Sequence, residues 1–485
     1  MKYKWTALTV TTVGATMGGI DTRIAIIGLP TIAAQLNAGA EEVVWITQAY
    51  LLSATIFLLV FGRIADIFGR VKLYNLGFIV FTVGSALCAL SINPYMLIAF
   101  RLLQGTGASL LTANSAAIIT DATPRNELGA MLGFNATAFR VGAMAGLTLS
   151  GLILSVVDWR GLFYVNIPIG IFGTIWAHYR LREIATTDTS RRMDWSGFIL
   201  FSGGLTLLLL ALTYLGYGLS ASLVEGSAFL AIGLALLIVF FKYESKSKSP
   251  LLDPRLFSIK TFAMGNIAQL LLGLAWAGVI LLVPLYLQLG LGYSALQAGI
   301  AALPLEICYL FSTLASGRLS DRYDPRVLSI LGLAVIVTGL AIVSTFGDGV
   351  LYALVALALS LIGVGSGFFT MPMSRAIMVS VSPVRRGVAS AFMNTIFNVG
   401  FTASYGLVIL LITLGIPYGA FSTLLENAQA LPAGSIDRLE FLTGFRITAI
   451  VLALIVVATI LPTAMMGGER EEQNPSRQNL SESEP

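Results

Sequence analysis

The stretch Gly62-Arg-Ile-Ala-Asp-Ile-Phe-Gly-Arg-Val-Lys72 decides the fold, because its charged side chains stand between two long apolar runs. The core of a bilayer disfavours such charges, so we expect the stretch to form a short loop on one face of a membrane. Gly62 and Gly69 would let the backbone reverse direction tightly. Asp66 could pair with a neighbouring arginine or accept backbone N–H groups at a helix start.

A related stretch, Gly317-Arg-Leu-Ser-Asp-Arg-Tyr-Asp-Pro-Arg326, recurs in the second half of the chain, again between apolar runs. The segment Gly129–Gly142 also aligns with Gly387–Gly400, and in the same alignment Gly107 meets Gly365. Identical residues then fall at 129/387, 134/392, 137/395, 139/397, 141/399 and 142/400. The chain is therefore predicted to contain two related units.

Composition identifies a membrane protein: 56% of the 485 residues are hydrophobic and only 11% are charged, against about 25% in soluble proteins. A spanning helix needs about 20 apolar residues. We predict fourteen spans: Trp5–Leu36, Val43–Phe61, Leu73–Ser91, Tyr95–Thr120, Leu128–Ser155, Leu162–Tyr179, Trp195–Tyr214, Ala228–Phe241, Phe262–Leu287, Ser294–Leu319, Val327–Phe346, Val350–Ser380, Gly387–Leu414 and Phe441–Met466.

The predicted fold is an all-α integral membrane protein of two six-helix bundles in a parallel, pseudo-twofold repeat, with two inserted helices. The predicted N-terminal bundle is 1–182, the linker with the two inserted helices is 183–258, the C-terminal bundle is 259–466, and 467–485 is a disordered cytoplasmic tail. Among the predicted outer loops, the only basic residues are Arg160 and Arg438, which places both termini in the cytoplasm of a multi-pass plasma-membrane protein.

Ionisable groups inside the predicted spans are the first candidates for function, because each costs about 2.5–3.5 kcal/mol at a helix centre. Asp21 and Arg101 fall at similar depth in the outer half, so they could form an ion pair that a proton on Asp21 would break. A purely structural ion pair is the alternative. Arg23 cannot share the helix face of Asp21, and it would either extend outward or face a neighbouring helix.

The second candidate site lies between the two units, where parallel repeats place the substrate. Arg140 is a cation kept in one unit only, since its counterpart is Asn398. Glu306 falls near the membrane midplane, and Arg375 lies nearer the cytoplasm. We assign Arg140, Glu306, Arg375 and Asn398 to a substrate cavity. A pairing of Glu306 with Arg140 or Arg375 is the structural alternative.

Glycines in two predicted helices would let neighbouring helices approach closely. These helix-packing candidates are Gly105, Gly107, Gly142, Gly146 and Gly151. The chain has two cysteines, Cys88 and Cys308, and one histidine. This inventory provides no Cys/His metal site, and we predict neither a metal nor a cofactor.

Several motifs resemble those of the major facilitator superfamily. The stretch from Gly62 to Lys72 is similar to its loop between the second and third helices, and Arg101-Leu-Leu-Gln-Gly-Thr-Gly107 resembles its helix-4 motif Arg-x-x-Gln-Gly-x-Gly. The segment from Ile20 to Pro30 resembles the helix-1 motif of fourteen-helix drug:proton antiporters, as does Trp159-Arg160 followed by Asn166-Ile-Pro-Ile-Gly170.

Two departures from the antiporter motifs are clear. In helix 1, Arg23 and Ile26 replace the usual Thr and Asn. In helix 5, Leu147 and Ser150 replace a Pro and a Gly of the antiporter pattern. The fold expectation is unaffected, but antiport and uniport both stay open.

The resemblance implies a secondary active transporter and not an enzyme, with proton-coupled efflux of small organic or drug-like molecules by alternating access. A proton-independent uniporter or a transporter of lipids or organic anions is the alternative. Asp21 and Arg101 would couple to protons. The expected partners are substrate, protons and the lipid bilayer, with no nucleic acid, and the protein would be a monomer. The expected cytoplasmic gate comprises Gly62, Asp66, Gly69, Arg70, Gly317, Asp321 and Arg322.

Overall fold

The computed structural model is all-helical over the part of the chain that it describes, residues 3–124, 127–184, 194–216, 220–247, 254–320, 322–347, 349–381, 386–427 and 435–467. Beyond Gly467, the predicted tail lies outside the described residues. The first helices are α1 (Tyr3–Leu36), α2 (Ala40–Phe68), α3 (Arg70–Ala89), α4 (Pro94–Ala122), α5 (Leu128–Val156), α6 (Gly161–Tyr164) and α7 (Asn166–Arg180).

The chain continues through a helical pair and then a second long series. The pair is α8 (Trp195–Gly216) and α9 (Ser220–Glu244). The series comprises η1 (Pro254–Ser258), α10 (Lys260–Leu285), η2 (Tyr286–Gly290), α11 (Ala295–Ala301), α12 (Leu303–Leu319), α13 (Pro325–Ser344), α14 (Tyr352–Val379), α15 (Arg386–Ile412), α16 (Tyr418–Asn427) and α17 (Ile436–Met465).

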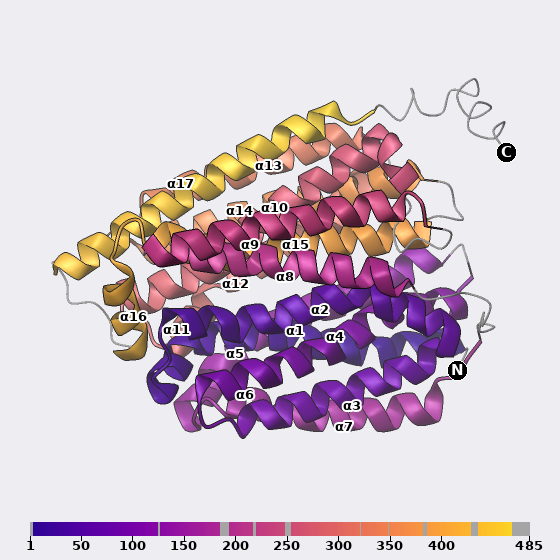
Figure 1. Ribbon diagram of the computed structural model, residues 1–485, viewed down its shortest axis with the longest axis horizontal. Helices are drawn as coiled ribbons and strands as arrows, with labels where there is room; N and C mark the ends of the chain where they lie inside the picture. Colours follow the sequence, from indigo (N-terminus) through magenta and orange to yellow (C-terminus); the bar gives the residue numbers. More distant parts are fainter. Residues whose placement is uncertain are drawn as a thin grey trace.

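Within the described residues, eleven helical segments are long and apolar enough to cross a membrane. A multi-pass membrane protein is thereby supported, while the number fourteen stays a prediction. The long helices run side by side, and α1 begins at the same end of the bundle where α17 ends (Figure 1). We call this end the terminal end; the opposite end, where α6, α11 and α16 lie, is the distal end (Figure 1).

Helix pairs recur in the two series. The helix α1 packs on α5 as α10 packs on α15, α2 packs on α4 as α12 packs on α14, and α3 packs on α4 as α13 packs on α14. A Cβ placed on Gly142 would lie 2.2 Å from the carbonyl oxygen of Thr16, and one on Gly400 would lie 2.2 Å from that of Leu270. Both pairs of helices therefore cross at a glycine with backbone against backbone.

Between the two series, α2 packs on α15, and α5 packs on α11 and α12. The inserted pair α8 and α9 pack on each other, and α8 also packs on α2 and α15. Buried apolar side chains from both series join in one large cluster. The core is therefore continuous across the contact between them.

The predicted span Ser294–Leu319 is interrupted where a proline follows. The helix α11 ends at Ala301 and α12 begins at Leu303, with Pro304 in its first turn. Proline fits the first turn of a helix because its missing N–H has no partner there in any case. The interruption places Glu306 in the first turn of α12, where the helix dipole favours a negative charge.

The charged stretch from Gly62 to Lys72 is not the short loop that we predicted. The helix α2 continues through Gly62 and Asp66 to Phe68, and α3 begins at Arg70. Gly69 alone connects them, with φ +104°, a conformation that side chains rarely adopt. A single glycine is thus enough for the reversal, and the charges extend a helix instead of forming a loop.

The related stretch that begins at Gly317 also starts inside a helix, because Gly317 lies within α12. Arg322 follows in the turn before α13, and its backbone N–H donates to the carbonyl oxygen of Leu319 over 2.9 Å. Asp321 lies outside the described residues, as does the side chain of Asp66.

Candidate functional site: a buried carboxylate and its donors

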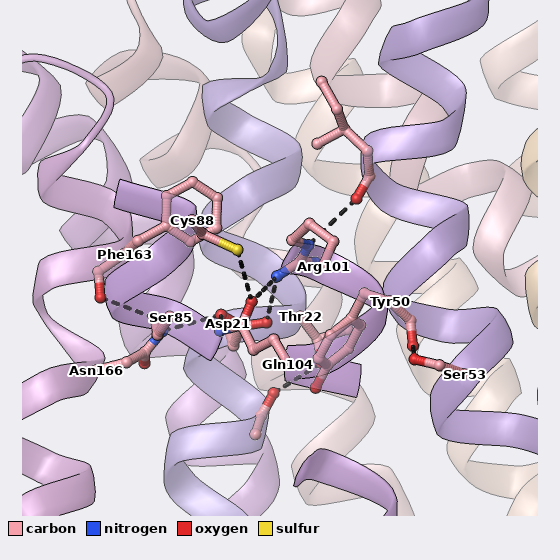
Figure 2. A network of polar contacts seen from close by, with 12 residues as sticks. Asp21, Thr22, Tyr50, Ser53, Ser85, Cys88, Arg101, Gln104, Phe163 and Asn166 are labelled. Carbon is pink, nitrogen blue, oxygen red and sulfur yellow. Dashed lines mark hydrogen bonds and ion pairs between the residues drawn. The ribbon is translucent and has the colours of Figure 1, made fainter. Parts of the chain in front are cut away.

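Asp21 lies near the middle of α1 and is fully buried, at 0% exposure. Arg101 of α4 is 1% exposed, and its Nη1 donates to Asp21 Oδ2 over 2.8 Å. The two residues therefore form the ion pair that their similar depth predicted. Figure 2 shows them at the centre of a polar network.

Two amides complete the shell around the carboxylate. Gln104 Nε2 donates to Asp21 Oδ1 over 2.8 Å, and Asn166 Nδ2 of α7 donates to the same oxygen over 2.9 Å (Figure 2). Asn166 also donates to Ser85 Oγ on α3, and the Ser85 hydroxyl donates to the carbonyl oxygen of Phe163. The carboxylate on α1 is thus tied to α4 and α7 directly, and to α3 and α6 through Asn166 and Ser85.

Arg101 is held by more than the carboxylate. Its Nε donates to the carbonyl oxygen of Ile46 over 3.2 Å, and its Nη1 also donates to Gln104 Oε1 over 2.8 Å. Its guanidinium lies over the ring of Tyr50, 4.3 Å from the centroid. An arginine over an aromatic face gains a favourable electrostatic contact. These contacts hold Arg101 in position in addition to its ion pair with Asp21.

The chemistry of the network depends on the charge of Asp21. An ionised carboxylate only accepts hydrogen bonds, and here it accepts from three side chains. A protonated carboxyl would give up part of that capacity and would leave Arg101 as a buried cation without its counter-charge. A buried charge deprived of its partner is costly, about 3–5 kcal/mol. Protonation of Asp21 would therefore favour a rearrangement around Arg101.

A second charged cluster joins the two helix series. Arg23 of α1 donates from Nε and Nη2 to Glu306 Oε1 of α12, over 2.9 and 2.7 Å. Arg140 of α5 places its Nη1 3.6 Å from Glu306 Oε2. Arg23 and Glu306 are buried at 2% and 0% exposure, whereas the side chain of Arg140 is 19% exposed. We call Arg23, Arg140 and Glu306 the central cluster.

Glu306 pairs with arginines, as the structural alternative predicted, but its partners are only partly the predicted ones. Arg140 lies beside this carboxylate, as one alternative proposed, but the close hydrogen bonds come from Arg23. Arg23 thus faces a neighbouring helix and does not extend outward. Arg375 on α14 and Asn398 on α15 are half-buried. The central cluster unites Arg140 and Glu306 of the four predicted cavity residues.

The packing glycines lie at backbone contacts. A Cβ on Gly105 would lie 2.2 Å from the carbonyl oxygen of Tyr50, and one on Gly107 would lie 2.4 Å from the Phe81 nitrogen. On α5, a Cβ on Gly146 would lie 2.6 Å from the Ile20 carbonyl oxygen. The glycine at 151 differs from these, because its Cβ would lie 2.1 Å from Cα of residue 296, in α11 of the other series.

At the terminal end, the gate candidate Arg70 donates from Nη1 to Asp121 Oδ1 over 2.7 Å. The carboxylate of Glu183 accepts the backbone N–H groups of Arg70 and Val71 over 2.9 and 3.0 Å. These contacts tie the start of α3 to the end of α4 and to the segment after α7. Sequence reasoning did not identify Asp121 or Glu183 as partners.

Other residues of the site also went unassigned. Gln104 lies within the quoted Arg-x-x-Gln-Gly motif and Asn166 within the quoted Asn-Ile-Pro-Ile-Gly segment, so the signals for both were present. The partnership of Arg23 with Glu306 had no local signal, because the two residues come from different series. Among the described residues, no group of three or more His, Cys, Asp or Glu side chains is arranged to hold a metal ion.

Comparison with known proteins assigns the chain to a family. The model of the Major Facilitator Superfamily matches residues 11–405. The chain is 31% identical to the riboflavin transporter RibZ of Clostridioides difficile (strain 630) over 407 residues, which cover 83% of this chain and 86% of the relative. It is 32% identical over 410 residues to the cephamycin export protein CmcT of Amycolatopsis lactamdurans, covering 81% and 82% of the two chains.

A further relative is the multidrug transporter protein MdtP of Bacillus subtilis (strain 168), at 27% identity over 383 residues, covering 79% of this chain and 70% of MdtP. Among solved structures, a bacterial homologue of the human lysosomal transporter Spinster, inward-facing and unoccupied, matches with a TM-score of 0.69 at 16% identity, covering 98% and 99% of the chains. That likeness concerns the fold alone. The family match and the identity to RibZ show that the chain belongs to the Major Facilitator Superfamily and is a multi-pass membrane transporter.

Proposed function

We propose that the chain is a proton-coupled exporter of small organic molecules, a fourteen-helix drug:proton antiporter that works by alternating access. The observation that carries the proposal is the fully buried carboxylate of Asp21, which accepts from Arg101 and two amides. Such a carboxylate can exchange its ion pair for a proton, and each form stabilises a different arrangement of α1 against α4. The names of the relatives CmcT and MdtP, an export protein and a multidrug transporter, support export of organic compounds.

The proposed architecture is the two-unit repeat that the sequence predicts, with units 1–182 and 259–466 around the inserted helices. The recurring helix pairs and the matched contacts of Gly142 and Gly400 support it. We place the protein in the plasma membrane as a monomer, with the terminal end in the cytoplasm and the distal end outside. Substrate would then bind between the units, near Arg140, Glu306, Arg375 and Asn398.

The proposed cytoplasmic gate is formed by the charged stretches at the terminal end. Their members are Gly62, Asp66, Gly69, Arg70, Gly317, Asp321 and Arg322. The contacts of Arg70 with Asp121 and of Glu183 with the start of α3 support a gate whose parts move as one body. The connection through the single residue Gly69 also favours this, because so short a link keeps the ends of α2 and α3 close together.

Transport in sealed liposomes with an imposed pH gradient tests this function. A first screen of organic cations, organic anions and lipids identifies a transported compound. An antiporter should then accumulate that compound uphill while protons move the other way, and a protonophore should abolish the accumulation. Equilibration that ignores the pH gradient would instead indicate a uniporter.

A further inference from the structure

We propose that the central cluster, together with Tyr405, Tyr309 and Trp276, forms a binding subsite for a planar aromatic anion such as an aromatic carboxylate. This inference rests on the proposed transport function and names its substrate class. The cluster includes two guanidinium groups and one carboxylate, so its formal charge is positive. A buried positive site attracts an anion and repels a cation.

Unused hydrogen-bond donors identify where the anion would bind. Among the described residues, Arg23 Nη1 is buried without a hydrogen-bond partner, and so is the hydroxyl of Tyr405 on α15. Tyr405 is 1% exposed and interacts electrostatically with Arg23 and with Arg101. Buried polar groups in folded proteins are nearly always paired. Two unpaired donors beside surplus positive charge therefore call for an acceptor that a carboxylate would supply.

Aromatic rings lie against Arg140 of the central cluster and beside Tyr405. The guanidinium of Arg140 lies over the Tyr309 ring, 4.0 Å from its centroid, and this ring is 5.2 Å from that of Trp276. On α15, Phe401 lies between Phe397 and Tyr405, with centroids 6.1 and 5.9 Å apart. Flat aromatic ligands gain by stacking on such rings and on a guanidinium plane.

The two series contribute jointly to this subsite. Arg23 and Arg140 come from α1 and α5, whereas Glu306 and Tyr405 come from α12 and α15. Glu306 Oε2 has no hydrogen-bond partner among the described residues, although Arg140 stands 3.6 Å away. We infer that Glu306 competes with a substrate carboxylate for the two guanidinium groups.

Binding of three matched probes tests the subsite: naphthalene-2-carboxylate, its neutral carboxamide and the corresponding naphthylmethylammonium. The full chain in lipid nanodiscs is titrated at a single pH on both sides, with tryptophan fluorescence as the readout. The carboxylate should bind about tenfold more tightly than the other two. Equal binding of the three, tighter binding of the ammonium, or no binding of the carboxylate would overturn the proposal.

Variants assign the effect to named groups. Arg140→Gln should weaken carboxylate binding about tenfold and change carboxamide binding little. Its side chain is partly exposed, so this variant should fold, and Arg140→Lys should restore part of the affinity. Glu306→Gln should strengthen carboxylate binding, because it removes the competitor. Arg160→Gln is the control, since Arg160 pairs with Asp158 in the loop before α6.

The two proposals fail separately. Because binding is measured without a gradient, a preference for the ammonium would overturn the subsite and leave proton coupling intact. A carboxylate-binding protein whose transport ignored a pH gradient would contradict proton coupling alone. Unchanged carboxylate binding in a folded Arg140→Gln variant would overturn the subsite whatever the wild-type preference.

Discussion

At the scale of single residues, Asn166 is one of the three side chains that donate to Asp21, the proposed proton-coupling carboxylate. Its Nδ2 donates to the carboxylate over 2.9 Å from a third helix. Donors of this kind favour the ionised form of a carboxyl, so their loss makes protonation easier. Asn166→Leu should therefore move the pH profile of transport toward higher pH. The measurement is initial transport rate against pH in liposomes.

Ser85→Ala is the matched control for that prediction. Ser85 bonds to Asn166 and not to Asp21, so its loss should move the profile less than Asn166→Leu does. A shift of Asn166→Leu toward lower pH, or identical profiles for the two variants, would show that the amide does not tune the carboxylate.

Residue by residue, the sequence allowed one ion pair to be predicted and not the other. Asp21 and Arg101 belong to the same series of helices, and the fixed rise of a helix gives their relative depth. Arg23 and Glu306 belong to different series, and their approach depends on how the two series sit against each other. That arrangement follows from packing along whole helices, which local motifs do not encode.

At the scale of helices, α1 and α5 meet with backbone against backbone. A Cβ on Gly142 would lie 2.2 Å from the Thr16 carbonyl oxygen, and a helix backbone cannot yield as a flexible side chain does. Gly142→Ala should therefore lower stability by about 1–3 kcal/mol, the usual cost of overpacking. Thermal unfolding of the purified protein in detergent measures this loss as a lower Tm.

Gly133 on the same helix provides the control. A Cβ there would have no neighbouring atom of the described residues within 4 Å. Gly133→Ala should leave the Tm unchanged or raise it, because alanine favours helices over glycine by about 0.5–1 kcal/mol. Equal effects of the two substitutions would contradict the packing role of Gly142.

The positions of the helices were easier to predict from the sequence than the residues at which they break. Long apolar runs predicted where the long helices of the described residues lie, and eleven helical segments there are long and apolar enough to cross a membrane. The break at Ala302 was missed, as was the helical state of Gly62 and Asp66, because charge and hydropathy do not reveal where backbone hydrogen bonding stops. Only Gly69, with its positive φ, ends the helix there.

At the scale of the whole molecule, the two series touch at the distal end through α5 and α11. A Cβ on Gly151 would lie 2.1 Å from Cα of Leu296, and one on Gly299 would lie 2.2 Å from the Leu147 carbonyl oxygen. The backbones approach this closely only because Gly151 of one series and Gly299 of the other have no side chain. Since this contact joins the two series at the distal end, we expect a side chain at either glycine to shift the population toward states in which the series are farther apart there.

Gly151→Ala should therefore lengthen the distance between spin labels at Val156 and Leu351, both exposed near the distal end. Pulsed electron resonance on a background without the native cysteines measures that distance. Gly142→Ala serves for comparison, because its contact lies within one series and its loss should leave the distribution unchanged. An unchanged distribution in Gly151→Ala would show that this contact does not hold the two series together at the distal end.

The central claim is that the Asp21 carboxylate carries the coupling proton. Uphill transport by the Asp21→Asn variant in liposomes tests it most directly. The variant keeps an acceptor oxygen for Arg101 but cannot exchange a proton. It should lose accumulation driven by a pH gradient while exchange of labelled for unlabelled substrate persists. Glu225→Gln, an exposed acid on α9 changed in the same way, should retain both activities. Gradient-driven accumulation by Asp21→Asn at the wild-type level would contradict the account.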